Sequence, residues 1–115
     1  MTTAVKRLKN GKACGEDNII NEMIRVFTED HLHMLTQIFN VVLLSGHIPD
    51  DWVTGIIKPI YKNKDDISDP GNYRGITLLS CLGKLLIFII NERLTAFINS
   101  KQIMSEVQAG FRKGY

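Results

Sequence analysis

The 115-residue chain has little of what marks several specialised classes of protein. Its two cysteines, Cys14 and Cys81, lack the spacing of a metal site, so neither zinc nor a secreted disulfide framework is indicated. Three prolines and nine glycines are too few for a collagen-like or low-complexity chain. The longest uninterrupted apolar run, 85–90, is much shorter than the ~20 residues that cross a bilayer. These absences predict an intracellular protein with reduced thiols and no membrane partner.

An excess of charge of one sign is also missing. Fourteen lysines and arginines against twelve acidic residues leave a net charge of +2. Because so small a surplus does not attract nucleic acid by itself, any phosphate contact must depend on local clustering. A hydrophobic content of 44% and a charged content of 23% are typical of one globular domain or of a piece of a larger one.

Hydrophobic periodicity and chain-breaking residues predict an α+β fold. Helices are expected over 4–9, 21–27, about 32–45 and 81–99, and strands over 53–62 and 73–78. Gly46 is expected to end the third helix, and Ser80 to cap the start of the last one. Pro59 cannot donate to a β-ladder, so it predicts a sheet edge or a bulge.

The last helix is apolar on more than one side. One stripe, expected to be buried, consists of Leu82, Leu85, Leu86, Ile89, Ile90, Leu94 and Phe97. Ile87 and Phe88 fall outside it, so we expect a second side that packs against protein not present in this chain. The alternative is that the N-terminal helices cover both sides.

The histidines and paired aspartates do not predict a catalytic or metal centre. His31 and His33 point in different directions on a helix, and no other ligand completes a set with them or with His47. The aspartates at 50–51 and 65–66 lie in expected turns, where Asp is favoured for its hydrogen bonds to the backbone.

Four cations gather on the expected hairpin: Lys58, Lys62, Lys64 and Arg74. Lys58 and Lys62 share a face of a regular strand, and the turn brings Arg74 back opposite them. Such a group suits a polyphosphate, since Arg offers a planar fork of donors and Lys a mobile point charge. Three aspartates within 65–69 offset much of this charge, so a merely solvated hairpin is the alternative interpretation.

Several motifs, taken in order, resemble the reverse transcriptases of LINE-type, non-LTR retrotransposons. They are Gly11-Lys12-Ala13 with Gly15 and Asp17, then Ser45 to Trp52, Ile56 to Lys62, Asp69 to Ser80, Lys84, Arg93-Leu94, and Gln108 to Gly114. The likeness covers nearly the whole chain, and the ordered set is far more specific than any single motif.

The resemblance implies an incomplete right-hand polymerase fold that lacks the palm. A helical N-terminal extension is expected over 1–52, and a fingers-like segment with the hairpin and the long amphipathic helix over 53–115. The implied partners are an RNA template, a DNA primer, a deoxynucleotide and the missing palm. The family's habits place such a protein in the nucleus or the cytoplasm.

The resemblance also implies roles for particular residues. Arg74 and Lys62 match residues that grip the nucleotide triphosphate, and Lys58 and Lys64 are weaker candidates for the same role. A second implied group, expected close to the template, consists of Gln108, Gly110 and Phe111.

The sequence departs from the family pattern at several positions. The catalytic aspartates would lie downstream of Tyr115, so Mg²⁺ is implied for the full-length parent, and we expect this fragment to bind no cofactor and to be inactive alone. Gly75 stands where the family usually has Pro, and Ile87-Phe88 where it usually has a charged pair. The alternative function is a stand-alone helical module that binds a partner protein through 81–99, with no nucleotide role.

Overall fold

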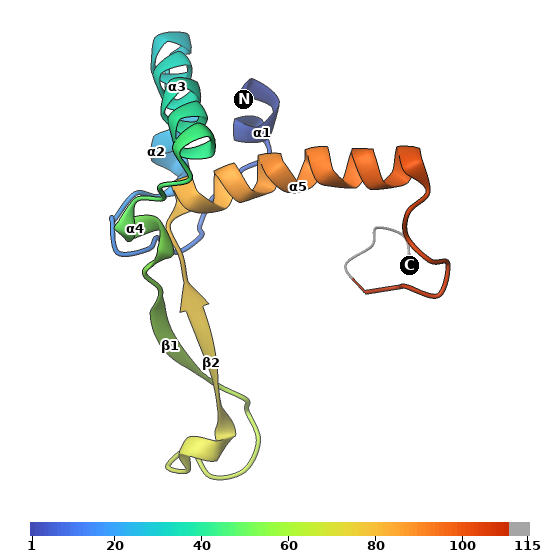
Figure 1. Ribbon diagram of the computed structural model, residues 1–115. Helices are drawn as coiled ribbons and strands as arrows, with labels where there is room; N and C mark the ends of the chain where they lie inside the picture. The colour runs from blue at the N-terminus through green and yellow to red at the C-terminus, as the bar shows by residue number, and fades with distance from the viewer. Residues whose placement is uncertain (111–115) are drawn as a thin grey trace.

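The computed structural model describes residues 1–110 and confirms the α+β class. In chain order the elements are α1 (Thr2–Lys6), α2 (Asn21–Arg25), α3 (Glu29–Ser45), α4 (Asp50–Val53), β1 (Ile56–Tyr61), the 3₁₀ turn η1 (Pro70–Asn72), β2 (Tyr73–Leu78) and α5 (Cys81–Lys101). The helices α1 to α3 gather around the start of α5, and the β1–β2 hairpin projects away from them (Figure 1).

The ends of α3 follow local signals. The Thr28 hydroxyl accepts a hydrogen bond from the His31 amide, and the His31 ring accepts one from the Thr28 amide. This reciprocal pair is a capping box, which satisfies amides that have no partner inside the helix. Gly46 adopts the left-handed conformation at φ 71° and ends the helix as expected. His31 therefore contributes to the start of a helix.

The start of α5 is fixed by the loop that precedes α2. The buried Ser80 hydroxyl accepts a hydrogen bond from the Gly83 amide, which confirms the expected cap, and donates one of 2.7 Å to the Asp17 carboxylate. Gly15 lies directly against the backbone there, because a Cβ at Gly15 would come within 2.5 Å of the Ser80 nitrogen. The loop and the helix start therefore form one packed unit.

The core lies where α1, α2, α3 and the first half of α5 meet. Its buried apolar residues are Ala4, Val5, Ile24, Leu35, Phe39, Val42, Cys81, Leu85 and Leu86. Trp52 of α4 packs edge-on to Phe39, with ring centroids 5.7 Å apart, and lies against Gly83. The short helix α4 thereby joins α3 and α5 at the base of the hairpin.

The expectation of one buried stripe along the whole of α5 is wrong. Leu94 and Phe97 are 52% and 54% exposed, because the second half of α5 runs past the other helices (Figure 1). Phe88, expected to lie outside the covered stripe, packs against the core and lies under the Arg7 guanidinium, whereas Ile87 is exposed. The reason is that α1 is short and α3 meets only the start of α5, so neither helix covers its second half (Figure 1).

Several expected boundaries also shift. The first helix ends at Lys6, α2 ends at Arg25, and α5 continues to Lys101. The expected strand over 53–62 begins only at Ile56, because residues 50–53 form α4. Two aspartates in the first turn of α4 favour its helical conformation over the β-propensity of Val53.

The molecule is open rather than compact. Its Cα radius of gyration is 17.6 Å, whereas a compact domain of this length has one of about 13 Å. It exposes 8938 Å² of surface, against about 6,300 Å² for a folded monomer of this mass. Among residues 1–110, no helix is both long and apolar enough to cross a membrane.

Candidate functional site

The β1–β2 hairpin places its cations on one face. The strands are antiparallel, with Ile60 opposite Arg74 and Lys58 opposite Ile76. Just past the strands, the Lys62 amide donates a 2.8 Å hydrogen bond to the Asn72 carbonyl, so the same register continues into the turn. Because opposite residues share a face, as do residues two apart, Lys58, Lys62 and Arg74 lie on the same side, as the sequence predicts.

Three of the four cations meet at one hollow. The hollow has a volume of about 300 Å³ and is lined by Ile60, Tyr61, Lys62, Lys64, Arg74 and Ile76. Lys58 shares the face but does not line the hollow, since it lies further along β1. The hairpin therefore presents two ammonium groups and one guanidinium around a partly apolar floor.

The aspartates of the turn shape the backbone and do not pair with these cations. Asp66 accepts a hydrogen bond from the Ser68 amide, and Asp69 one from the Gly71 amide. Within the described part of the chain, none of the four hairpin cations has a carboxylate close enough for an ion pair. Their charge is therefore available to a ligand.

The hydrogen-bond partners of Lys62 and Arg74 differ. The Lys62 ammonium donates to the Gly71 carbonyl at 3.4 Å, a long contact that an anion can replace. The Arg74 guanidinium has no hydrogen-bond partner among residues 1–110.

The opposite face of the hairpin holds the turn in place. The rings of Tyr61 and Tyr73 lie 5.5 Å apart, and their hydroxyls donate to the Asp65 and Ile67 carbonyls. Pro59 is paired with Gly75 without a break in register, which confirms the edge interpretation over the bulge. Amides along an antiparallel strand point alternately toward the partner strand and away from it, and the Lys62 amide points toward the partner strand. The Pro59 nitrogen, three residues earlier, therefore points away from β2, so no ladder hydrogen bond is lost.

The residues expected near the template lie elsewhere in the chain. Gln108 and Gly110 are exposed and follow α5, and the Gln108 side-chain amide donates to the Gly110 carbonyl. Phe111 lies outside the described residues. Since α5 has 21 residues, its length of about 31 Å separates this segment from the start of the helix. The described part of the chain does not bring them to the hairpin (Figure 1).

The same residues offer few ligands for a metal ion. No group of three or more His, Cys, Asp or Glu side chains there is able to hold a metal. The described residues therefore do not form a carboxylate cage that could hold a cation such as Mg²⁺ by itself.

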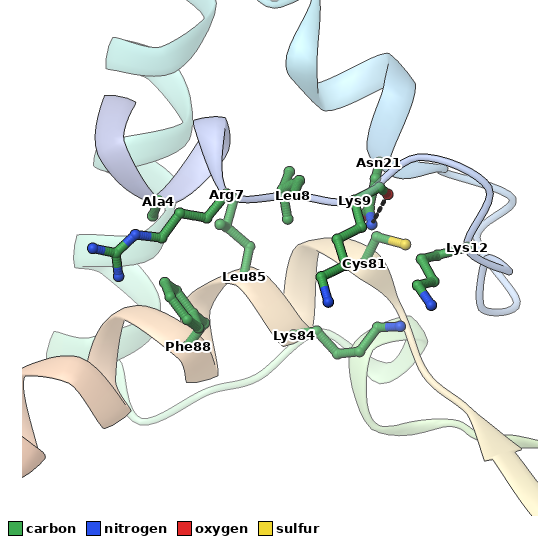
Figure 2. Close-up of a pocket in the computed structure, with 10 residues that line it drawn as sticks. All are labelled: Ala4, Arg7, Leu8, Lys9, Lys12, Asn21, Cys81, Lys84, Leu85 and Phe88. Carbon is green, nitrogen blue, oxygen red and sulfur yellow. Dashed lines mark hydrogen bonds between the residues drawn. The ribbon is translucent and has the colours of Figure 1, made fainter. Parts of the chain in front are cut away.

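A second cationic hollow was not predicted from the sequence. It lies between the segment after α1 and the start of α5, and its lysines are Lys9, Lys12 and Lys84 (Figure 2). No local spacing connects these positions, because only the tertiary fold brings 9–12 against the first turn of α5.

The chain is similar in sequence to proteins encoded by mobile elements. No protein-family model matches it. It is 31% identical, over 96% of its length, to the probable RNA-directed DNA polymerase from transposon X-element of Drosophila melanogaster. It is 34% identical over 94% of its length to the RNA-directed DNA polymerase from mobile element jockey of the same species. The type-1 retrotransposable element R1 polyprotein of Bradysia coprophila is 35% identical over 82% of the chain.

The chain is similar to a segment of non-LTR retrotransposon polymerases. The resemblance that its motifs predict is thereby confirmed. The chain spans 12% of the length of the X-element and jockey polymerases and 10% of the R1 polyprotein.

Proposed function

We propose that the chain is a fingers-type segment of a retroelement RNA-directed DNA polymerase, and that its hairpin binds the triphosphate of a deoxynucleotide. The observation that carries this proposal is the hollow where Lys62, Lys64 and Arg74 meet without a carboxylate partner in the described residues. The relatives named above, which are such polymerases, support the same activity for the parent protein.

The hairpin residues divide the work of binding between them. The Arg74 fork donates paired hydrogen bonds to phosphate oxygens, and Lys62 exchanges the Gly71 carbonyl for a third oxygen. Lys64 adds charge at the same hollow, and Lys58 adds a weaker field from further along the strand. Because phosphoryl transfer depends on neutralising and positioning these oxygens, the hairpin supports the reaction without carrying it out.

The proposal also covers the rest of the chain. The chain divides into a helical extension over 1–52 and a fingers-like segment over 53–115. Within the second segment, the residues proposed to lie close to the template strand are Gln108, Gly110 and Phe111. The partners are an RNA template, a DNA primer and the palm of the parent enzyme, in the nucleus or the cytoplasm. Mg²⁺ would be held by residues of that parent, and no step proposed for the hairpin depends on it.

Binding of a fluorescent deoxynucleoside triphosphate to the 115-residue chain tests the hairpin. Because a hydrogen bond to a charged group contributes about 1.5–3 kcal/mol, we expect Arg74→Gln to weaken binding roughly 10-fold or more. Lys62→Gln should weaken it less, and Arg74→Lys should restore part of the affinity. The matched control is Lys101→Gln, which removes one exposed charge at the end of α5. Equal affinity in wild type and Arg74→Gln would refute the assignment.

A second candidate function rests on the exposed half of α5. Ile87, Leu94 and Phe97 are all more than half exposed, which favours a module that binds a partner protein through this helix. The salt dependence of nucleic-acid binding separates the two candidates. The polymerase segment binds RNA with an affinity that falls as salt rises, whereas the protein-binding module does not bind RNA.

A further inference from the structure

A hollow of about 350 Å³ lies beside the start of α5, and no residue of the hairpin lines it. It is lined by Ala4, Arg7, Leu8, Lys9, Lys12, Asn21, Cys81, Lys84, Leu85 and Phe88 (Figure 2). The charged residues in this set are all cations. Figure 2 shows the ammonium groups of Lys9, Lys12 and Lys84 on the same side of Cys81, and the Arg7 guanidinium turned the other way, toward Phe88.

The three lysines differ from Arg7 in their partners. Arg7 forms an ion pair with Glu92 at 3.0 Å and lies over the Phe88 ring, 5.8 Å from its centroid. Across residues 1–110, the ammonium groups of the three lysines have no hydrogen-bond or ion-pair partner. The charge of Arg7 is thus already paired, and that of the lysines is not.

Two carboxylates that act electrostatically on Cys81, a lining residue of this hollow, are engaged elsewhere. Glu22 accepts a 2.6 Å hydrogen bond from the Gly11 amide, and this bond is the main reason that the Glu22 pKa lies below its usual range. Asp17 accepts hydrogen bonds from the Ser80 hydroxyl and the Ile19 amide. Neither side chain forms an ion pair with the three lysines in the described chain.

The segment that carries Lys9 and Lys12 is held in place from two sides. The Lys9 carbonyl accepts a 2.9 Å hydrogen bond from the buried side chain of Asn21 on α2. The Cys81 thiol of α5 donates to the Ala13 carbonyl at 3.8 Å. Lys84 of α5 also lines the hollow, and its charge opposes the rise in the pKa of the Cys81 thiol that burial causes. The cations are therefore carried on fixed backbone.

We propose that Lys9, Lys12 and Lys84 form a second phosphate site, which binds backbone phosphates of a single-stranded nucleic acid. Lysines are point charges that attract phosphates without selecting a base, and the apolar wall of Leu8, Leu85 and Phe88 suits sugars and base faces. The choice of nucleic acid as the ligand rests on the proposed function. The cluster of unpaired cations is observed in the structure and does not depend on that function.

Fluorescence anisotropy with a labelled 20-nucleotide RNA of mixed sequence, over a series of KCl concentrations, tests the site. The test variant of the 115-residue chain is K9Q/K12Q/K84Q, and the matched control K6Q/R93Q/K101Q loses the same charge at exposed positions. With about 0.7 counterions released per contact, the test variant should lower the log–log salt slope by about 2 and weaken low-salt binding about 10-fold or more. The control should change affinity by less than about 3-fold.

Three results would overturn the proposal: no RNA binding by the wild-type chain, equal affinity of wild type and test variant, or an equal loss in the control. The variant K9R/K12R/K84R keeps the charge and should keep the affinity. If the triple variant melts early by circular dichroism, Lys12→Gln in the exposed loop must still weaken binding about 3-fold. Arg74→Gln separates this site from the hairpin: it should lower triphosphate binding and leave RNA affinity nearly unchanged.

Discussion

Gly15 and Gly75 differ in the space around them. A Cβ at Gly15 would lie 2.5–2.9 Å from backbone atoms of Leu79 and Ser80, which cannot move without shifting the start of α5. A Cβ at Gly75 would meet only the Ile57 side chain, at 3.6 Å, an ordinary contact distance. The same substitution therefore has opposite expected effects at the two positions.

We expect Gly15→Ala to lower the free energy of unfolding by roughly 1–3 kcal/mol, because the added methyl group overpacks a fixed backbone. Gly75→Ala should raise it by about 0.5–1 kcal/mol, because alanine loses less backbone freedom on folding. Urea unfolding followed by circular dichroism measures both. Similar midpoints for the two variants would contradict the close packing of the loop on α5.

At the scale of the element, the two halves of α5 differ in how much of their surface is buried. From Cys81 to Ile89 it packs on the core, and beyond that its apolar side chains are largely exposed. Leu85 is 1% exposed and Leu94 is 52% exposed, although both belong to the same apolar stripe.

This difference predicts unequal costs for one substitution. Leu85→Ala should destabilise the chain by about 2–5 kcal/mol, since it leaves a cavity in the core. Leu94→Ala should cost less than about 1 kcal/mol, because the side chain buries little surface here. Thermal unfolding of the two variants under identical conditions gives the comparison. A large loss with Leu94→Ala would mean that the second half of α5 is covered in solution.

Local signals were sufficient to predict two helix caps, but not the exact ends of the other elements or what covers them. Ser80 and Gly46 act through their own backbone neighbourhood, so the sequence alone identifies both caps. Periodicity shows which side of α5 is apolar, but the extent of burial depends on the lengths and crossing angles of α1 and α3. For the same reason, strand periodicity places Lys62 and Arg74 together, and nothing in the spacing reveals the hollow of Lys9, Lys12 and Lys84.

At the scale of the whole molecule, the excess exposed surface includes large apolar side chains. Ile87 is 61% exposed on α5, in the most hydrophobic stretch of the sequence. Burial of such side chains is favourable, so two copies of the isolated chain gain free energy by covering them.

We therefore expect the isolated chain to self-associate at high concentration, and Ile87→Lys to weaken this association by at least several-fold. Val107→Lys is the control, since it adds the same charge at a 92% exposed position beyond α5. Sedimentation velocity over a concentration series measures the association. A wild-type chain that stays monomeric throughout would show that the exposed half of α5 does not drive contacts between copies.

The proline in β1 has a consequence for the outer edges of the hairpin. A two-stranded sheet leaves one row of outward donors and acceptors on each strand, and another strand is able to add to either row. Pro59 removes a donor from the row on β1, whereas Gly75 at the paired position keeps its outward amide in the row on β2. A proline at 75, as the resemblance implies for the family, would block that row as well. A third strand can therefore add to the hairpin along β2 more readily than along β1.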